Sequence, residues 1–273
     1  MNSPQSEGQA PCKQPVIGVG ISATSYDEVV SCCRQWIENR RAHEGKPSAR
    51  YICVTSVHGI ITARDDSGVR EILNSADIAT PDGMPLVWAL RSFGVKNQQR
   101  VYGPTLMLRL CESAGKNAHR VFLYGGREET IGELRARLQA RFPDLRIVGS
   151  YSPPFRPLTE EEDRTVERQI ADCGAEMIFV GISTPKQERW MYEHREKFPG
   201  LVMIGVGAAF DFHAGRVRQA PAWMQRNGLE WLFRLVAEPR RLWQRYLLVT
   251  PRFLPLWAMQ LMSGRTNAGP RRA

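Results

Sequence analysis

The sequence predicts an α/β protein in which helices flank a mostly parallel, doubly wound sheet, followed by a C-terminal helical appendage. Three observations support this prediction. Short apolar or β-branched runs alternate with helical patterns over residues 15–220, and several of these runs end in polar residues. After residue 221 the strand pattern stops. Alternation at these lengths is typical of right-handed strand–helix–strand crossovers.

Seven strands are expected in the first part of the chain. They are predicted at 15–21, 51–57, 75–79, 121–126, 146–151, 177–182 and 201–206. Helical spacing of apolar residues predicts helices at 27–40, 65–73, 106–114, 128–140 and 159–173, with two more beginning near Pro85 and Pro185. Thr159 and Glu162 have the spacing of a capping box at the start of one of them.

The predicted appendage consists of short helices at 221–228, 229–237, 240–249 and 252–262. Pro239, Pro251 and Pro255 are expected to break them, because proline removes a helical hydrogen bond. The domain prediction is therefore a disordered N-terminus at 1–14, an α/β domain at 15–220, the appendage at 221–262 and a disordered tail at 263–273.

Positive charge is concentrated at the C-terminus. The formal net charge is +9, and from Arg226 onward nine arginines stand against two glutamates, which places +7 of it there. This distribution indicates that the C-terminal segment meets an anionic surface or leaving group. No apolar run reaches the ~18 residues of a membrane span. The six cysteines lack zinc-like spacing and are expected to be reduced thiols, so a cytoplasmic location is predicted.

The stretch TPDGMPLVW, residues 80–88, is the leading candidate for the working centre. A strand precedes it and a helix follows, so Asp82 is expected at the carboxyl edge of the sheet, where ligands bind. Gly83 allows close approach there, and Pro81 restricts its neighbour to extended geometry. Asp82 is a candidate general base, but Asp is also a favoured helix N-cap, and both roles stay open.

Two further strand-to-helix turns are candidates for ligand contact. Gly125 and Gly126 resemble a phosphate-accepting turn, although two glycines also suit any tight turn. Lys186 and Gln187 follow a predicted strand at a helix N-terminus, where N–H groups favour an anionic or amide-bearing ligand. An ordinary helix start explains these two residues equally well.

Some classes of site are disfavoured. The first predicted strand lacks the third glycine of the nicotinamide fingerprint. No DxD element is present to hold a divalent ion, and His58, His119, His194 and His213 are isolated in the sequence. We therefore predict no cofactor and no metal, and we expect cationic side chains of the protein to stabilise negative charge in the reaction.

Aromatic residues and arginines are interleaved over residues 231–257. This mixture fits a solvated helix pair, a nucleic-acid surface or a membrane-surface helix. Apolar stripes with Trp at the boundary and Arg on the other face favour an anionic bilayer. Nucleic-acid binding is not predicted, because basic charge is not spread over the folded domain. A non-enzymatic nucleotide- or RNA-binding protein remains the alternative of another class.

Six ordered motifs resemble a known family. They are TxxH after the second strand, TPDGMPLVW, RVxGPxLM, FLYGG, VGISTPKQERW and GVGAAFDFxAG. Together they resemble the WecG/TagA/CpsF glycosyltransferases, also called glycosyltransferase family 26, from about Val16 to the C-terminal arginines. The resemblance implies an inverting, metal-independent enzyme with a Rossmann-like fold. Such an enzyme would move a sugar from a nucleotide-diphosphate donor, commonly UDP-N-acetylmannosamine, to a polyprenyl-diphosphate-linked sugar at the inner face of the cell membrane.

The resemblance also implies roles for particular residues. Asp82 matches the aspartate proposed as catalytic base, and Thr55, Arg100 and Gln187 match active-site positions. The C-terminal arginines match an appendage thought to close over the donor and touch the membrane. The predicted substrate-binding residues are Thr55, His58, Arg100, Gly125, Gly126, Lys186, Gln187, Asp211, Arg234, Arg240 and Arg241.

One departure concerns substrate choice. Many members of the family have Thr-x-Asn after the second strand, whereas this chain has Thr55-Ser56-Val57-His58. The donor sugar therefore stays open, and a glucosyl- or mannosyltransferase of exopolysaccharide repeat-unit assembly is the alternative within the enzyme class. The predicted partners are the nucleotide sugar, the lipid-linked glycan and an anionic membrane surface, with a homo-oligomer left open.

Overall fold

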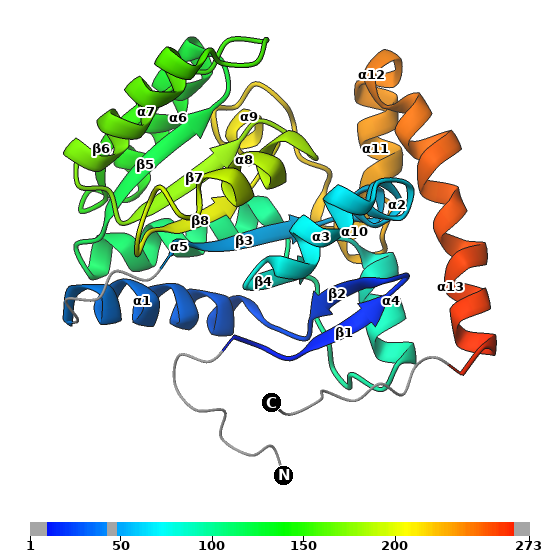
Figure 1. Cartoon of the computed structure of the whole chain (residues 1–273). Coiled ribbons are helices and arrows are strands. Elements are labelled where there is room, and N and C mark those ends of the chain that lie inside the picture. The colour runs from blue at the N-terminus through cyan, green and yellow to red at the C-terminus, as the bar shows by residue number, and fades with distance from the viewer. Residues whose placement is uncertain (1–9, 43–47, 265–273) are drawn as a thin grey trace. The chain divides into compact units, whose positions relative to one another are not determined.

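The computed structural model describes residues 10–42 and 48–264 (Figure 1). The described chain groups into two compact units. Residues 26–53 and 103–217 belong to the first, and residues 11–25, 54–102 and the chain from Arg218 onward belong to the second. This grouping combines the C-terminal helices with two earlier segments, while the domain division predicted at residue 220 stays a prediction.

The first unit contains a parallel sheet. Its elements are α1 (Tyr26–Ala42), β3 (Arg50–Thr55), α5 (Gly103–Lys116), β5 (Arg120–Gly125), α6 (Glu128–Arg141), β6 (Arg146–Tyr151), α7 (Glu160–Asp172), β7 (Met177–Gly181), α8 (Lys186–His194), β8 (Val202–Gly205) and α9 (Ala209–His213). The last two residues of β3, Val54 and Thr55, are counted with the second unit.

Within the first unit the strand order is β3-β8-β7-β5-β6, and the pairs β3–β8, β8–β7, β7–β5 and β5–β6 are parallel. Strands β5, β7 and β8 form the core, because Val121–Tyr124 and Met177–Val180 are almost fully buried. The chain runs outward from β5 to β6 and then returns through β7 to β8. Right-handed crossovers therefore put α6 on one face and α7 and α8 on the other. The predicted α/β class and its parallel sheet are confirmed.

The second unit contains β1 (Lys13–Val16), β2 (Val19–Ser22), α2 (Val57–Asp65), α3 (Ser67–Ser75), β4 (Ile78–Pro81) and α4 (Met84–Ser92). Its C-terminal part contains α10 (Ala222–Arg226), α11 (Glu230–Ala237), α12 (Pro239–Trp243), a π-helical turn (Gln244–Val249), a 3₁₀ turn (Thr250–Arg252) and α13 (Phe253–Met262).

The prediction of a single strand at 15–21 is wrong. The chain makes an antiparallel hairpin of β1 and β2, which is a separate two-stranded sheet. Ile17 and Gly18 form its two-residue turn, both at positive φ (50° and 82°), as a type I′ turn requires. Lys13 and Gln14 pair with Ser22 and Ile21, so this part of the predicted disordered N-terminus is ordered. Residues 1–9 lie outside the described part.

A helix that the sequence analysis missed follows β3. The strand ends at Thr55, and Ser56 caps α2 by accepting a hydrogen bond from the Gly59 N–H. Asp66 then caps α3 through the N–H groups of Gly68 and Val69. The expected strand at 51–57 is therefore too long, because polar caps redirect the chain into two short helices.

The prolines of the C-terminal segment do not act alike. Pro239 begins α12, and Pro251 lies in the 3₁₀ turn, but Pro255 lies inside α13, which was predicted to break there. Pro255 is the third residue of α13, where a missing N–H leaves no helical bond unmade. Ser263 and Gly264 end the described chain, and the rest of the predicted disordered tail lies outside it.

Candidate active site

Asp82 lies on the turn between β4 and α4, as the sequence predicts. Its N–H donates to the Thr55 carbonyl over 2.8 Å, which ties the turn to the end of β3. The N-cap of α4 is Gly83, at φ 139°, and no side chain caps this helix. The carboxylate of Asp82 is therefore not used for capping, and Gly83 supplies a backbone conformation that other residues rarely adopt.

The Asp82 carboxylate is held by Arg100. The Nε and Nη2 atoms of Arg100 both donate to Oδ1 of Asp82, over 3.1 and 2.9 Å. The two side chains are 19% and 16% exposed, so the pair is largely shielded from water. Within the described residues, Oδ2 of Asp82 accepts no hydrogen bond, which leaves one carboxylate oxygen unengaged.

Arg100 is also held by two residues that the sequence analysis did not select. Its Nη1 lies 2.7 Å from Oε2 of Glu230, the first residue of α11. The Tyr102 hydroxyl donates to Oε1 of Glu230 over 2.9 Å, and the guanidinium lies 4.1 Å from the centre of the Tyr102 ring. Two carboxylates and one aromatic face therefore surround a single cation.

These neighbours determine the protonation behaviour of the pair. Burial raises the pKa of Asp82 above its ordinary value; Arg100 opposes this rise and Glu230 adds to it. Burial alone would lower the pKa of Arg100, but the two carboxylates raise it overall. Arg100 thus stays charged, while Asp82 holds a proton more readily than an exposed aspartate.

A second arginine, Arg245, lies near the same carboxylate. Its Nη2 donates to the Ser56 hydroxyl over 3.2 Å, and its Nε is buried with no hydrogen-bond partner among the described residues. Burial lowers the pKa of Arg245, and Asp82 opposes that effect. A half-buried guanidinium with an unused donor can accept an anion at little reorganisation cost.

His58 lies in the first turn of α2, close to Arg245. Burial, and then the positive charge of Arg245, lower its pKa to about 4. The ring is therefore neutral at physiological pH, and its buried Nδ1 has no partner among the described residues. The structure thus brings Thr55, His58, Asp82 and Arg100 together within the second unit.

Gly125 and Gly126 end β5 in the first unit. A Cβ on Gly125 would lie 2.5 Å from the Gly181 carbonyl oxygen, so the glycine is required by the close approach of β7. The Gly126 N–H donates to that same carbonyl over 3.2 Å. Packing explains both glycines, and the Gly126 N–H is already used within the sheet.

Other predicted residues of the first unit differ in exposure. Lys186 is exposed, whereas Gln187 is 2% exposed and its Oε1 has no partner in the described chain. The Gln187 Nε2 donates to Glu188 over 3.0 Å. Asp211 is half-buried in α9. An unpaired buried amide oxygen is costly, which makes Gln187 the stronger candidate for ligand contact.

The three arginines predicted in the C-terminal segment lie on α11 and α12. Arg234 has a mostly buried side chain, 3.9 Å from Glu238, which also pairs with Arg241 over 2.5 Å. Arg240 and Arg241 are exposed. The arginine of this segment whose charge acts on Asp82 is instead Arg245, which the sequence analysis did not choose.

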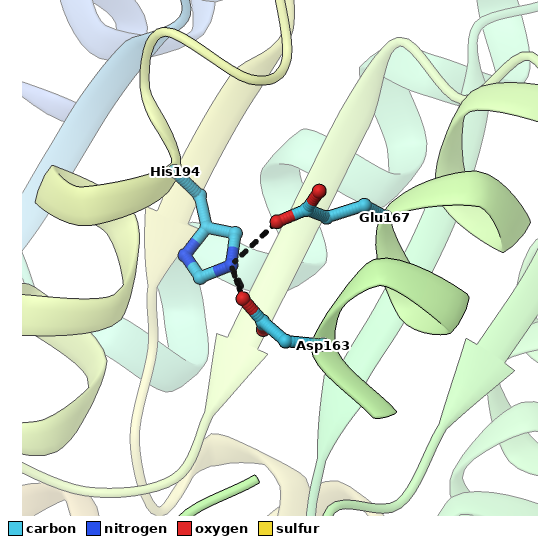
Figure 2. Close-up of side chains that lie close together, drawn as sticks. All are labelled: Asp163, Glu167 and His194. Carbon is cyan, nitrogen blue, oxygen red and sulfur yellow. Dashed lines mark hydrogen bonds and ion pairs between the residues drawn. The ribbon is translucent and has the colours of Figure 1, made fainter. Parts of the chain in front are cut away.

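His194, which is isolated in the sequence, is buried and has two acidic neighbours in the fold. Figure 2 shows its ring, from α8, pointing toward Asp163 and Glu167 of α7. Its Nε2 lies 3.0 Å from Asp163 Oδ1 and 3.6 Å from Glu167 Oε1. These groups have the chemistry of metal ligands, but the Lys197 ammonium already pairs with both carboxylates. The absence of a metal from the chemistry stays a prediction.

The fold is α/β, and Asp82 lies on a strand-to-helix turn, the kind of position at which α/β enzymes commonly bind their ligands. The model of the glycosyl transferase WecG/TagA/CpsF family matches residues 14–267, almost the whole chain. The chain belongs to this family, and it is a glycosyltransferase.

Two relatives from Bacillus are named N-acetylglucosaminyldiphosphoundecaprenol N-acetyl-beta-D-mannosaminyltransferase. The protein of Bacillus subtilis strain 168 is 33% identical over 198 residues, which cover 72% of this chain and 73% of the relative. The protein of Bacillus spizizenii strain W23 is 35% identical over 176 residues, which cover 64% of this chain and 66% of the relative, just under two thirds.

Proposed function

We propose that this protein transfers a sugar, of the N-acetylmannosamine type or a hexose, from a nucleotide-diphosphate donor to a polyprenyl-diphosphate-linked acceptor sugar in cell-surface polysaccharide synthesis. The observation that carries the proposal is the Asp82–Arg100 pair on the β4–α4 turn of a chain in this family. The names of the two Bacillus relatives support the lipid-linked acceptor and the donor sugar class.

In the proposed reaction, Oδ2 of Asp82 takes the proton from an acceptor hydroxyl. The resulting oxygen nucleophile attacks the anomeric carbon from the face opposite the leaving nucleotide diphosphate, so the configuration inverts. The raised pKa of Asp82 supports this role, because a base with a pKa nearer the working pH takes a proton more effectively. Oδ1 keeps its bonds to Arg100, which fixes the carboxylate while Oδ2 reacts.

The leaving nucleotide diphosphate gains negative charge that the protein must stabilise. Arg100 has its Nε, Nη1 and Nη2 engaged by Asp82 and Glu230, so it is a poor candidate for this task. Arg245 is better placed, since it is half-buried close to Asp82 and its Nε donor is unused among the described residues. We assign charge stabilisation to Arg245 with Arg234, Arg240 and Arg241, and the proposed reaction needs no divalent metal.

A transfer assay tests the proposed function. We expect UDP-N-acetylmannosamine to be consumed, with release of UDP, when a lipid-diphosphate N-acetylglucosamine analogue is present, and the rate to persist in EDTA. UDP- and GDP-hexoses in parallel reactions identify the donor. No transfer from any of these donors, together with salt-sensitive binding of RNA, would favour the nucleic-acid alternative.

We also propose that the C-terminal segment attaches the protein to an anionic membrane surface at the inner face of the cell membrane. No helix in the described ranges is long and apolar enough to cross a bilayer. Leu247 and Leu248 are 54% and 57% exposed, and the neighbouring Arg240 and Arg241 are also exposed. Apolar side chains beside cations suit peripheral attachment to acidic lipids.

Vesicle flotation measures this attachment. Changing Arg240 and Arg241 to glutamine should weaken binding to phosphatidylglycerol vesicles by about 30-fold, since each arginine is worth ~1 kcal/mol at an anionic surface. Leu247→Glu with Leu248→Glu should abolish it. Phe155→Glu is the matched control, because Phe155 is 84% exposed but belongs to the first unit. If all variants bind the vesicles equally, the C-terminal segment does not attach the protein to the membrane and is a solvated helix pair.

A further inference from the structure

Glu230 has a position that the proposed reaction does not explain. It is the first residue of α11, 128 positions along the chain from Tyr102, yet its side chain is only 12% exposed, and its two oxygens lie against Arg100 and Tyr102. Oε2 pairs with Arg100 and Oε1 accepts the Tyr102 hydroxyl. Burying a second carboxylate beside Asp82 costs free energy, so a purely structural pair would be better served by one acid than by two.

We propose that Glu230 is a positioning residue that holds Arg100 between two carboxylates and so keeps Asp82 basic enough to take a proton. The proposal rests on the proposed function of Asp82 as general base. Arg100 alone, paired only with Asp82, would stabilise the ionised carboxylate and make it a weaker base. Glu230 shares that guanidinium and places its own negative charge in the same cluster.

The charged and titratable groups around Asp82 are consistent with this role. Arg100 and Arg245 stabilise its ionised form, and Glu230 destabilises it. The Tyr102 hydroxyl donates to the Glu230 carboxylate. Burial, and then the negative charges of Glu230 and Asp82, raise the pKa of that hydroxyl, so it stays protonated as a donor. Arg100, Glu230 and Arg245 therefore set the protonation of Asp82, and Tyr102 acts on it only through Glu230.

Another explanation makes Glu230 a stand-in for a donor phosphate at Arg100. It would then leave Arg100 when the donor binds, and removing its charge would tighten donor binding. A positioning role predicts the opposite pattern, with the KM for the donor unchanged and the proton-transfer step altered. The Glu230→Gln variant separates the two, because glutamine keeps the shape and can still accept hydrogen bonds.

The test is the dependence of kcat/KM on pH, measured with UDP-N-acetylmannosamine and the lipid-linked acceptor analogue. Activity needs ionised Asp82, so the rate rises with pH through the pKa of Asp82 and forms an acid limb. In Glu230→Gln we expect that limb to move to lower pH and the plateau to fall about tenfold, less than the ~10²–10⁴-fold that a general base contributes in all. Glu230→Asp should restore both.

Glu238→Gln is the matched control, since it removes an equal charge from the C-cap of the same helix and should leave the acid limb at the wild-type pH. Carbon-13 NMR of the side-chain carboxyls, with the Asp82 signal assigned by its loss in Asp82→Asn, follows the titration without any substrate. A lower midpoint for Asp82 in Glu230→Gln supports the proposal even if no sugar is transferred. An unchanged midpoint and acid limb, or a lower KM for the donor, overturns it.

Discussion

Replacing Asp82 with asparagine is expected to lower the rate of sugar transfer by ~10²–10⁴-fold, the usual contribution of a positioned general base. Asparagine has nearly the same shape, and its amide oxygen can still accept the hydrogen bonds of Arg100. What it lacks is the basic oxygen that takes the acceptor proton. Binding of the nucleotide sugar, measured by calorimetry, should change little, because Arg245 and the other C-terminal arginines remain.

Asp65→Asn is the control for this prediction. Asp65 belongs to the same unit and also holds an arginine, with two 2.7 Å hydrogen bonds to Arg252, but this pair is exposed. The control variant should keep wild-type turnover. An Asp82→Asn protein with full activity would remove Asp82 from the mechanism, whereas loss of donor binding in the same variant would give it a binding role instead.

The fold could be predicted because its strands are apolar runs that the chain buries completely. The spans at 146–151 and 177–181 match their predicted strands closely, and the capping box of Thr159 and Glu162 is present. The errors occur where local chemistry overrides an apolar pattern. Ile17 at positive φ converts one expected strand into a hairpin, and the Ser56 cap ends another early.

The candidate site was only partly predictable, for a physical reason. Asp82 carries a local signal, since proline and glycine flank it on a strand-to-helix turn. Glu230 carries none, because its partners lie 128 and 130 positions away and only folding brings them together. Arg245 could not be separated from the other C-terminal arginines, because only the fold brings it to Ser56 and close to Asp82.

The second large effect is expected on stability, at Arg100. Changing Arg100 to methionine should lower the free energy of unfolding by about 3–5 kcal/mol, because it leaves the carboxylates of Asp82 and Glu230 buried without their cation. Urea denaturation at neutral pH measures the loss. The triple variant Arg100→Met, Asp82→Asn, Glu230→Gln should recover most of it, since a neutral cluster has no unpaired charge to bury.

The decrease in the free energy of unfolding of Arg100→Met should also depend on pH, and the pKa of Asp82 determines the direction of that dependence. Its pKa in the folded protein is already raised by burial, and removing Arg100 takes away the main influence that lowers it. An acid whose pKa is higher in the folded state favours folding most below its unfolded pKa of ~3.9, and this advantage disappears as pH rises through the folded pKa. The variant should therefore lie closest to wild type in acid and furthest from it at neutral pH. If the variant loses the same free energy of unfolding at acid and at neutral pH, Arg100 stabilises the unit by packing on Tyr102 and not by its charge.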